Sequence, residues 1–254
     1  MHWRGQPLGG GRLPAVCAPL VGRTGEQLVA EAAAVAAKQP HLLEWRVDFF
    51  EGIGDTAAVL ASAAAIRTAA PGLPLLFTRR SSREGGEAIA LSEPQLIALY
   101  RAVCASGRID FIDYELGNEP AQVAQVRDAA RAGGVQLVLS FHDFHGTPAR
   151  EALQQRFALA QQLGADVAKI AVMPRGMDDV LRLLAATLDA SRTLTIPVIS
   201  MAMGGAGAIT RLAGGLFGSA LSFAVGQQAS APGQWPIEEL ETALALLRKA
   251  SGAS

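Results

Sequence analysis

The residue with the most informative surroundings is Lys169, which stands inside the apolar run 166–172. Lysine is almost never fully buried in proteins unless it is paired. Only three of the 22 basic residues are lysines, so an amine stands here in a chain that otherwise uses arginine. An amine can lose its proton and attack a carbonyl, whereas a guanidinium cannot. The run therefore predicts a Schiff-base nucleophile. The alternative is a lysine that reaches solvent or pairs with Glu115 or Asp143.

A histidine ends the preceding apolar run, in Ser140-Phe141-His142-Asp143-Phe144. An imidazole can take up a proton and return it near neutral pH. Neighbouring parallel strands would bring His142 close to Lys169, which favours an acid–base role over that of a core histidine bonded to backbone. His145 is expected on the rim.

Three loops carry further polar groups. Glu84-Gly85-Gly86 follows Phe77-Thr78-Arg79-Arg80, and a carboxylate there could orient the imidazole or simply pair with an arginine in solvent. The glycine-rich segment 200–211 could hold a phosphate on its amides, but Arg211, expected at the start of a short helix, favours a carboxylate clamp. Residues 227–234 form a polar loop that suits hydroxyl recognition or a lid, or a plain turn.

Short apolar runs and longer amphipathic, alanine-rich runs alternate along the chain, which is the pattern of a parallel sheet with crossover helices. Strands are expected at 15–21, 42–50, 73–79, 109–116, 135–141, 166–172, 196–201 and 220–225. Helices are expected at 26–38 behind Thr24, 55–68, 93–105 behind Ser92, 119–131, 148–163, 177–191, 210–216 and 237–250.

This alternation predicts an α/β fold, a single-domain (β/α)8 TIM barrel over residues 14–254, preceded by a loose leader at 1–13. An open doubly wound sheet is disfavoured, because the first strand is not followed by G-x-G-x-x-G. Active sites of barrels lie at the C-terminal ends of the strands, where the polar residues named above fall.

The composition narrows the possible partners. A formal net charge of -1 gives no electrostatic reason to expect nucleic acid or a membrane surface, so a small molecule is the expected partner. Cys17 and Cys104 lack CxxC spacing and are expected as buried free thiols. The N-terminus lacks the apolar core of a signal peptide, which predicts a cytoplasmic protein. No histidine or carboxylate spacing indicates a metal.

Taken together, the motifs resemble those of type I 3-dehydroquinate dehydratases over residues 15–248. The resemblance rests on Glu44-Trp45-Arg46-Val47-Asp48, Phe77-Thr78-Arg79-Arg80, Glu84-Gly85-Gly86, Asp113-Tyr114-Glu115-Leu116, Ser140-Phe141-His142-Asp143-Phe144, Thr147-Pro148, Ala168-Lys169-Ile170-Ala171, Ser200-Met201-Ala202-Met203-Gly204, Thr210-Arg211 and Ser230-Ala231-Pro232-Gly233-Gln234. Thr210, where the family usually has serine, and Trp235, where an aliphatic residue is commoner, depart from the pattern but remove no catalytic group.

The resemblance implies the elimination of water from 3-dehydroquinate in the shikimate pathway, with no cofactor and in a homodimer. It implies a Schiff base at Lys169, acid–base catalysis by His142 and orientation of His142 by Glu84. It implies that Arg211 binds the ring carboxylate. Hydroxyl binding or cavity shaping would fall to Glu44, Arg46, Arg80, Ser230 and Gln234, and the apolar wall to Met201, Met203 and Phe223.

Two other functions remain as alternatives. A class I aldolase-like lyase acting on a phosphorylated keto sugar would share Lys169 and the glycine-rich segment, but it does not account for His142 with Glu84. A non-catalytic barrel scaffold would not need to retain Lys169, His142 and Arg211.

Overall fold

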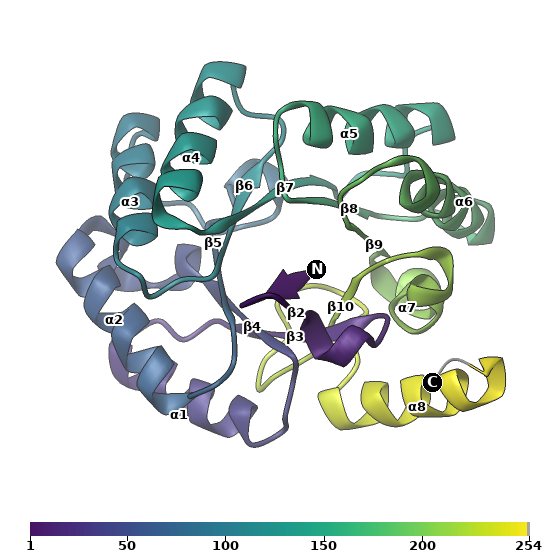
Figure 1. The fold of residues 1–254 in the computed structure, drawn as a ribbon, viewed down its shortest axis with the longest axis horizontal. Helices are drawn as coiled ribbons and strands as arrows, with labels where there is room; N and C mark the ends of the chain where they lie inside the picture. The colour runs from purple at the N-terminus through teal and green to yellow at the C-terminus, as the bar shows by residue number, and fades with distance from the viewer. Residues whose placement is uncertain (253–254) are drawn as a thin grey trace.

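Eight parallel strands form a barrel surrounded by helices in a computed structural model that describes residues 1–252 (Figure 1). The strands are β3 Ala15–Leu20, β4 Leu42–Arg46, β5 Leu75–Thr78, β6 Phe111–Glu115, β7 Gln136–Asp143, β8 Val167–Val172, β9 Val198–Ala202 and β10 Leu221–Phe223. Each pairs with the next, β10 pairs with β3, and a parallel bridge from Val198 to Ser219 closes the ring. The expected (β/α)8 barrel is confirmed.

The helices follow the strands in the expected order. They are α1 Gly25–Ala36, α2 Thr56–Ala69, α3 Glu93–Ala105, α4 Pro120–Gly133, α5 Arg150–Gln162, α6 Met177–Thr193, α7 Gly204–Ala213 and α8 Ile237–Ser251. Thr24 caps α1 in a reciprocal capping box with Gln27, which satisfies amides that the first turn leaves free. Local signals of this kind explain why most helix starts were predictable.

Two predicted boundaries were wrong. The strand expected at 42–50 ends at Arg46, because Asp48 turns back and binds the Arg46 guanidinium through contacts of 2.8 and 2.7 Å. The helix expected at 210–216 begins at Gly204, so the glycine-rich segment lies largely within α7 and Arg211 occupies its last turn, not its start. Glycine has a low helix propensity, which here is overridden by close packing against β9.

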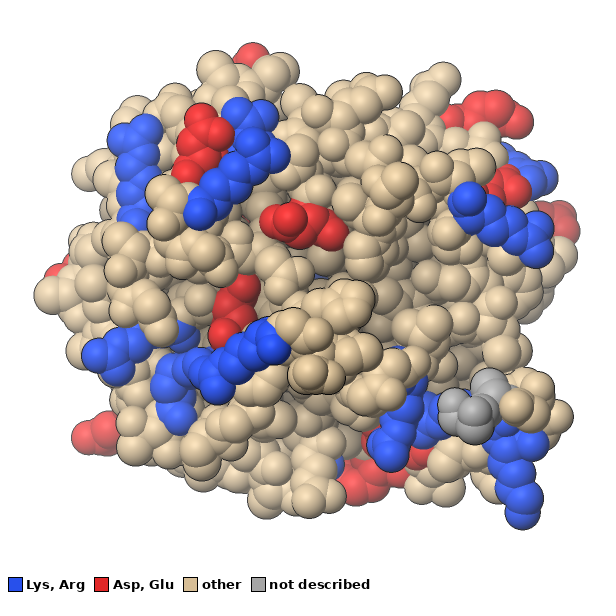
Figure 2. Space-filling view, in the orientation of Figure 1, with Lys and Arg blue, Asp and Glu red and all other residues tan. Residues whose placement is uncertain are grey.

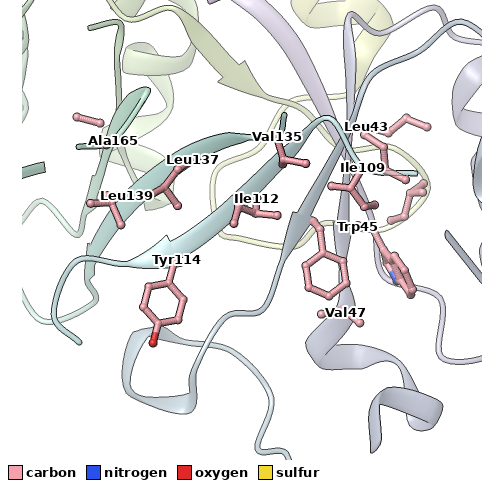
Figure 3. Close-up of a cluster of buried hydrophobic side chains, with 14 of the residues drawn as sticks. Leu43, Trp45, Val47, Ile109, Ile112, Tyr114, Val135, Leu137, Leu139 and Ala165 are labelled. Atoms are coloured by element: carbon pink, nitrogen blue, oxygen red, sulfur yellow. The ribbon is translucent and has the colours of Figure 1, made fainter. Parts of the chain in front are cut away.

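Apolar side chains fill the space between the barrel and its helices (Figure 3). Within this layer Trp45, Phe77, Tyr100 and Tyr114 form a row of edge-to-face contacts with ring centroids 5.4 to 5.6 Å apart. A second apolar cluster, which includes Leu42, Phe111 and Val167, fills the barrel interior. With both layers packed, polar groups gather toward the C-terminal ends of the strands.

The first residues are more ordered than a loose leader would be. β1 His2–Trp3 and β2 Gln6–Pro7 form a small antiparallel hairpin. Trp3 Nε1 donates to Asp110 at 2.7 Å, Gln136 Nε2 donates to the His2 carbonyl at 2.6 Å, and Leu8 packs into the interior cluster. These contacts are made just before β6 and at the start of β7, so the hairpin covers the N-terminal end of the barrel.

The charged side chains on the face drawn in Figure 2 are interspersed, with Lys and Arg next to Asp and Glu and no broad area of one sign. Among the residues that the structure describes, no helix combines the length and apolar character needed to cross a membrane.

The close approach of α7 to β9 generates a stability prediction. A Cβ on Gly207 would lie 2.3 Å from the Ala202 carbonyl oxygen, whereas a Cβ on Gly205 in the same helix would meet nothing within 4 Å. We expect Gly207→Ala to lower the free energy of unfolding by about 1–3 kcal/mol. Gly205→Ala, the matched control, should raise it by about 0.4–1 kcal/mol. Urea unfolding followed by tryptophan fluorescence measures the free energy of unfolding of both variants. Equal values for the two would contradict the close packing of Gly207 against Ala202.

Candidate active site

One cavity at the C-terminal end of the barrel brings together every residue that the sequence assigned to catalysis or substrate binding. Its lining contains Lys169, His142, Glu84, Glu44, Arg46, Arg80, Arg211, Ser230, Gln234, Met201, Met203 and Phe223. Gly85, Phe144, Ala171 and Ala231, which had no role assigned from the sequence, complete the wall. His145 is exposed and is not among the lining residues.

Lys169 is buried on β8, and its amine faces two carboxylates. The Nζ atom lies 3.1 Å from Asp113 Oδ2 and 3.5 Å from Glu44 Oε1. The partners considered from the sequence, Glu115 and Asp143, do not pair with it. The Phe223 ring covers Nζ with its centroid 4.3 Å away, a cation–π contact. A cationic nitrogen at this position is thus stabilised from two directions.

His142 lies near the end of β7 and contacts Glu84 twice. Glu84 Oε2 is 2.8 Å from His142 Nδ1 and accepts the His142 backbone N–H at 3.1 Å. Burial, reinforced by Arg80 and Lys169, holds the pKa of His142 well below 6.5, so the imidazole is neutral near pH 7. With Nδ1 engaged by Glu84, Nε2 is the nitrogen available to a ligand in the cavity.

Glu84 is placed by a tight turn. Gly85 has φ of 80°, and a Cβ on Gly86 would lie 2.1 Å from the Arg80 carbonyl oxygen, so both positions need glycine. Burial raises the pKa of Glu84 to about 8, although the Arg80 guanidinium opposes the shift. One proton is shared in the short contact between Glu84 and His142: when it lies on Nδ1, the ionised carboxylate accepts it and Nε2 keeps the free lone pair.

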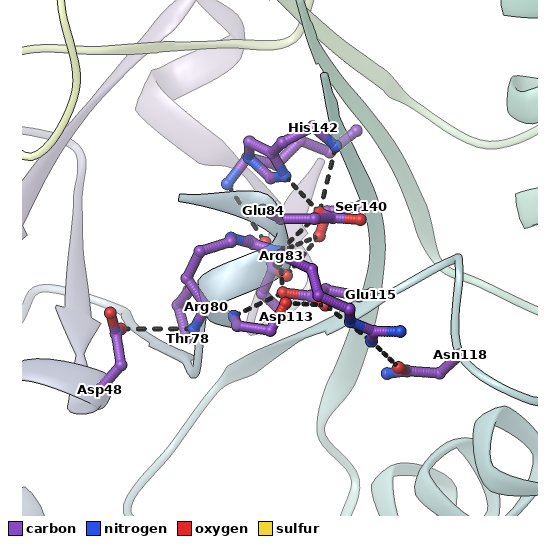
Figure 4. Close-up of polar contacts among 12 residues, drawn as sticks. Asp48, Thr78, Arg80, Arg83, Glu84, Asp113, Glu115, Asn118, Ser140 and His142 are labelled. Atoms are coloured by element: carbon purple, nitrogen blue, oxygen red, sulfur yellow. Dashed lines mark hydrogen bonds and ion pairs between the residues drawn. The ribbon is translucent and has the colours of Figure 1, made fainter. Parts of the chain in front are cut away.

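Arg80 joins these groups into one buried network (Figure 4). Its Nη1 contacts Glu84 and Glu115 at 3.3 Å and Ser140 at 2.9 Å, and its Nη2 donates to Asp113 at 2.7 Å. Arg80 thereby links Asp113, which contacts Lys169, to Glu84, which contacts His142. The guanidinium that the resemblance assigned to the substrate is thus largely occupied by protein side chains.

Asp113, Glu115 and Ser140 are parts of the site to which the sequence assigned no catalytic or substrate-binding role, although Glu115 was considered as a partner of Lys169. All three are buried, at 0%, 2% and 0% exposure. Asp113 and Glu115 stand two apart on β6, so both carboxylates point to the same side of the sheet. Two carboxylates on the same face of an otherwise apolar strand were the sequence signal that could have assigned these residues to the site.

Arg211 is a buried cation without a carboxylate partner in residues 1–252. The side chain is 1% exposed, so it lies within the cavity wall and not on a rim. Nη1 donates to the Phe223 carbonyl at 3.2 Å and Nη2 to the Pro232 carbonyl at 3.1 Å, while Nε has no partner. Burial lowers its pKa to about 10, which reflects the cost of an unneutralised charge. An anionic ligand in the cavity would supply the missing charge.

The segment 230–234 closes one side of the cavity. Gln234 accepts the Ser230 backbone N–H at 2.9 Å and donates to the Ser230 hydroxyl at 3.1 Å. The Pro232 carbonyl accepts from Arg211 and from the Gly204 amide at 3.3 Å. The loop is therefore tied to α7, and its two polar side chains face the cavity as a unit.

The part of the chain that the structure describes has no group of three or more histidine, cysteine, aspartate or glutamate side chains arranged to hold a metal ion.

Comparison with known proteins agrees with this geometry. The family model for type I 3-dehydroquinase matches residues 16–251. The 3-dehydroquinate dehydratase of Albidiferax ferrireducens is 62% identical over 248 residues, covering 98% of this chain and 94% of that protein. The crystal structure of 3-dehydroquinate dehydratase from Geobacillus kaustophilus is 52% identical with a TM-score of 0.91, covering 94% of this chain and 92% of that one.

A second solved structure adds a ligand. It is a type I 3-dehydroquinate dehydratase from Clostridium difficile with covalent modified comenic acid, 38% identical with a TM-score of 0.91, covering 94% of both chains. The family match spans nearly the whole barrel, and its residues include the buried lysine, the histidine–glutamate pair and the unpaired arginine described above. This chain belongs to the type I 3-dehydroquinase family.

Proposed function

We propose that this protein is a 3-dehydroquinate dehydratase that removes water from 3-dehydroquinate through a Schiff base at Lys169, giving 3-dehydroshikimate for aromatic amino acid biosynthesis. The observation that carries the proposal is a buried amine in the same cavity as a neutral imidazole held by a carboxylate. The family and the relatives named above support the substrate, and they favour it over the sugar phosphate of an aldolase-like lyase.

The first step joins Lys169 to the substrate ketone. The Lys169 ammonium gives up one proton and attacks the carbonyl carbon as a neutral amine; the carbonyl oxygen leaves as water with that proton and a second one from the nitrogen, so that a protonated imine with one N–H remains. The positive charge stays at Nζ, where Asp113, Glu44 and the Phe223 ring already stabilise a cation. A protonated imine withdraws electrons from the neighbouring C–H bond, which makes that proton removable.

His142 then moves the proton. Its Nε2 takes the proton from the carbon next to the imine and gives it to the departing hydroxyl, so that water leaves and a carbon–carbon double bond forms. Glu84 orients the ring and stabilises the imidazolium while it carries the proton. Hydrolysis of the imine releases the product and restores the free amine.

Arg211 is proposed to bind the substrate carboxylate. Nη1 contacts the Phe223 carbonyl and Met201 Sδ, and Nη2 donates one N–H to the Pro232 carbonyl, so the second N–H of Nη2 and the unpartnered Nε remain for a bidentate carboxylate. The comenic acid of the Clostridium difficile structure is itself an acid. In the same scheme Glu44, Arg46, Arg80, Ser230 and Gln234 hold hydroxyls or shape the cavity, and Met201, Met203 and Phe223 form its apolar wall.

A homodimer in the cytoplasm completes the proposal. Large apolar side chains are exposed on α6 and α7, with Met177 at 56%, Leu181 at 61% and Ile209 at 42% exposure, and they offer apolar surface to a second copy. Cys17 and Cys104 are free and buried, which suits a reducing compartment.

The proposed nucleophile is tested by trapping. With 3-dehydroquinate present, borohydride should reduce the imine and leave a covalent adduct at Lys169, located by peptide mass spectrometry. Lys169→Arg should give neither adduct nor turnover, because a guanidinium forms no imine. Lys249→Arg, at an exposed position of α8, is the matched control and should behave as wild type. Intact turnover with Lys169 unmodified would rule out the mechanism.

His142→Ala should still allow the adduct to form but should lower kcat by about 10²- to 10⁴-fold, the usual contribution of a general acid–base group. His145→Ala, three residues away and exposed, should keep nearly full activity. Steady-state kinetics with borohydride trapping on both variants checks this. A tolerated His142 change together with an inactivating His145 change would mean that the base is His145.

Arg211→Lys keeps the charge but loses the planar pair of donors. We expect the affinity for carboxylated ligands to fall about 10- to 150-fold, equivalent to the 1.5–3 kcal/mol of a hydrogen bond to a charged group. A ring analogue without the carboxylate should bind wild type and variant equally. Isothermal titration measures both ligands, and equal losses for the two would make Arg211 a structural residue.

A further inference from the structure

Asp113 divides its two carboxylate oxygens between different partners. Oδ1 accepts from Arg80 Nη2 at 2.7 Å and from the Ser140 hydroxyl at 2.6 Å. Oδ2 accepts from Lys169 Nζ at 3.1 Å. The side chain is fully buried on β6, so it cannot rotate away into solvent. One oxygen is anchored by two donors, and the other is thereby aimed at the amine.

The second carboxylate near the amine is less well placed to accept a proton from it. Glu44 Oε1 lies 3.5 Å from Nζ and already accepts the Thr78 hydroxyl at 2.9 Å. The Phe223 ring occupies another side of Nζ and offers no lone pair. Within residues 1–252, Asp113 therefore provides the best hydrogen-bond acceptor for a nitrogen at this position.

Asp113 is suited to remain ionised in this role. Burial alone would raise the pKa of its carboxyl group, but Arg80 and Lys169 outweigh that effect and hold the pKa below its usual value. A carboxylate accepts hydrogen bonds only, so its Oδ2 can serve the nitrogen throughout the reaction.

Once the imine has formed, the group that accepts its N–H determines how the imine is oriented in the cavity. A protonated amine has three N–H bonds, whereas the protonated imine has one, since the nitrogen forms a double bond to the former ketone carbon as the oxygen leaves in water. The imine is planar, so its two flanking ring carbons differ: one lies on the side of the N–H and the other on the side of the lysine chain. Whatever accepts the N–H decides which carbon lies on which side.

We propose that Asp113 is a positioning residue that accepts the single N–H of the imine and thereby fixes which of the two carbons flanking the former ketone faces His142. This inference rests on the proposed Schiff base at Lys169. It gives Asp113 a role in the site-selectivity of proton removal, separate from the roles of nucleophile and base.

Asp113→Asn tests the proposal with little change in shape. Arg80 and Ser140 donate to the Oδ1 position, so the amide oxygen must face them and the amide NH₂ must point at Nζ. The variant thus loses the acceptor for the lysine specifically. Asp128→Asn, at an exposed position of α4 outside the cavity, is the matched control, because it makes the same isosteric change away from Lys169.

Each enzyme is incubated with 3-dehydroquinate in D₂O, and deuterium at the two flanking carbons of recovered substrate is measured by NMR. Wild type and Asp128→Asn should exchange one carbon only. In Asp113→Asn we expect exchange at the second carbon as well, a kcat about 10- to 150-fold lower from the lost charged hydrogen bond, and adduct formation with borohydride still at Lys169.

Three results separate the possibilities. Exchange confined to the same carbon in Asp113→Asn would overturn the proposal, and so would loss of trapping in that variant alone, which would assign Asp113 to imine formation itself. Failure to trap wild type would instead overturn the Schiff base. If Asp113→Asn does not fold, the crystal structure of the borohydride-reduced wild-type adduct decides: its nitrogen should lie at hydrogen-bond distance from Asp113 Oδ2, and a bond to Glu44 instead would contradict the proposal.

Discussion

The ion pairs of Arg80 are the interaction on which the rest of the site depends. Its guanidinium, buried at the end of β5, contacts the carboxylates of Asp113, Glu115 and Glu84. Asp113 in turn holds Lys169, and Glu84 holds His142. Removing one member of a buried charged network leaves its partners desolvated and uncompensated, at a cost of about 3–5 kcal/mol. The amine and the imidazole are thus positioned by the same cation, although they lie on different strands.

The barrel makes this network possible because its interior is apolar toward one end and charged toward the other. Apolar side chains fill the lower part of the barrel, where Leu8 of the N-terminal segment joins them. Charged side chains occupy the other end, contributed by β4, β6, β7, β8 and the segment that follows β5. Parallel strands bring their C-terminal ends to one edge, so five separate segments can place a side chain in one cavity. Because these polar groups are buried, they lie in a low-dielectric environment where electrostatic contacts are strong.

Two side chains in the cavity lack a partner that the substrate could supply: Arg211 has no anion, and His142 Nε2 has no proton donor. Arg211 carries a buried charge whose partners are two backbone carbonyls and the Met201 sulfur, none of them an anion. His142 is kept neutral by burial and by neighbouring cations, so its Nε2 is ready to accept a proton. A substrate carboxylate would neutralise the charge of Arg211. An acidified C–H bond of the substrate would supply the proton that His142 Nε2 accepts. Such groups cost stability in the free protein and contribute when ligand binds.

The sequence by itself determined the order of strands and helices, most helix starts and the strand-end residues Lys169 and His142, whereas most other residues of the cavity wall came from the resemblance to a known family. It could do so because the periods of apolar residues, caps such as Thr24, and the position of polar residues at strand ends are local properties. Only the tertiary structure decided that α7 begins at Gly204, that Arg211 is buried in its last turn, and that Asp113 rather than Glu115 or Asp143 holds Lys169. Each of these depends on contacts between segments far apart in the chain: α7 on the β9 backbone, Arg211 on the carbonyls of Phe223 and Pro232, and Asp113 on Arg80. Local propensities carry no information on such contacts, because they are set by how the strands and helices pack around the barrel.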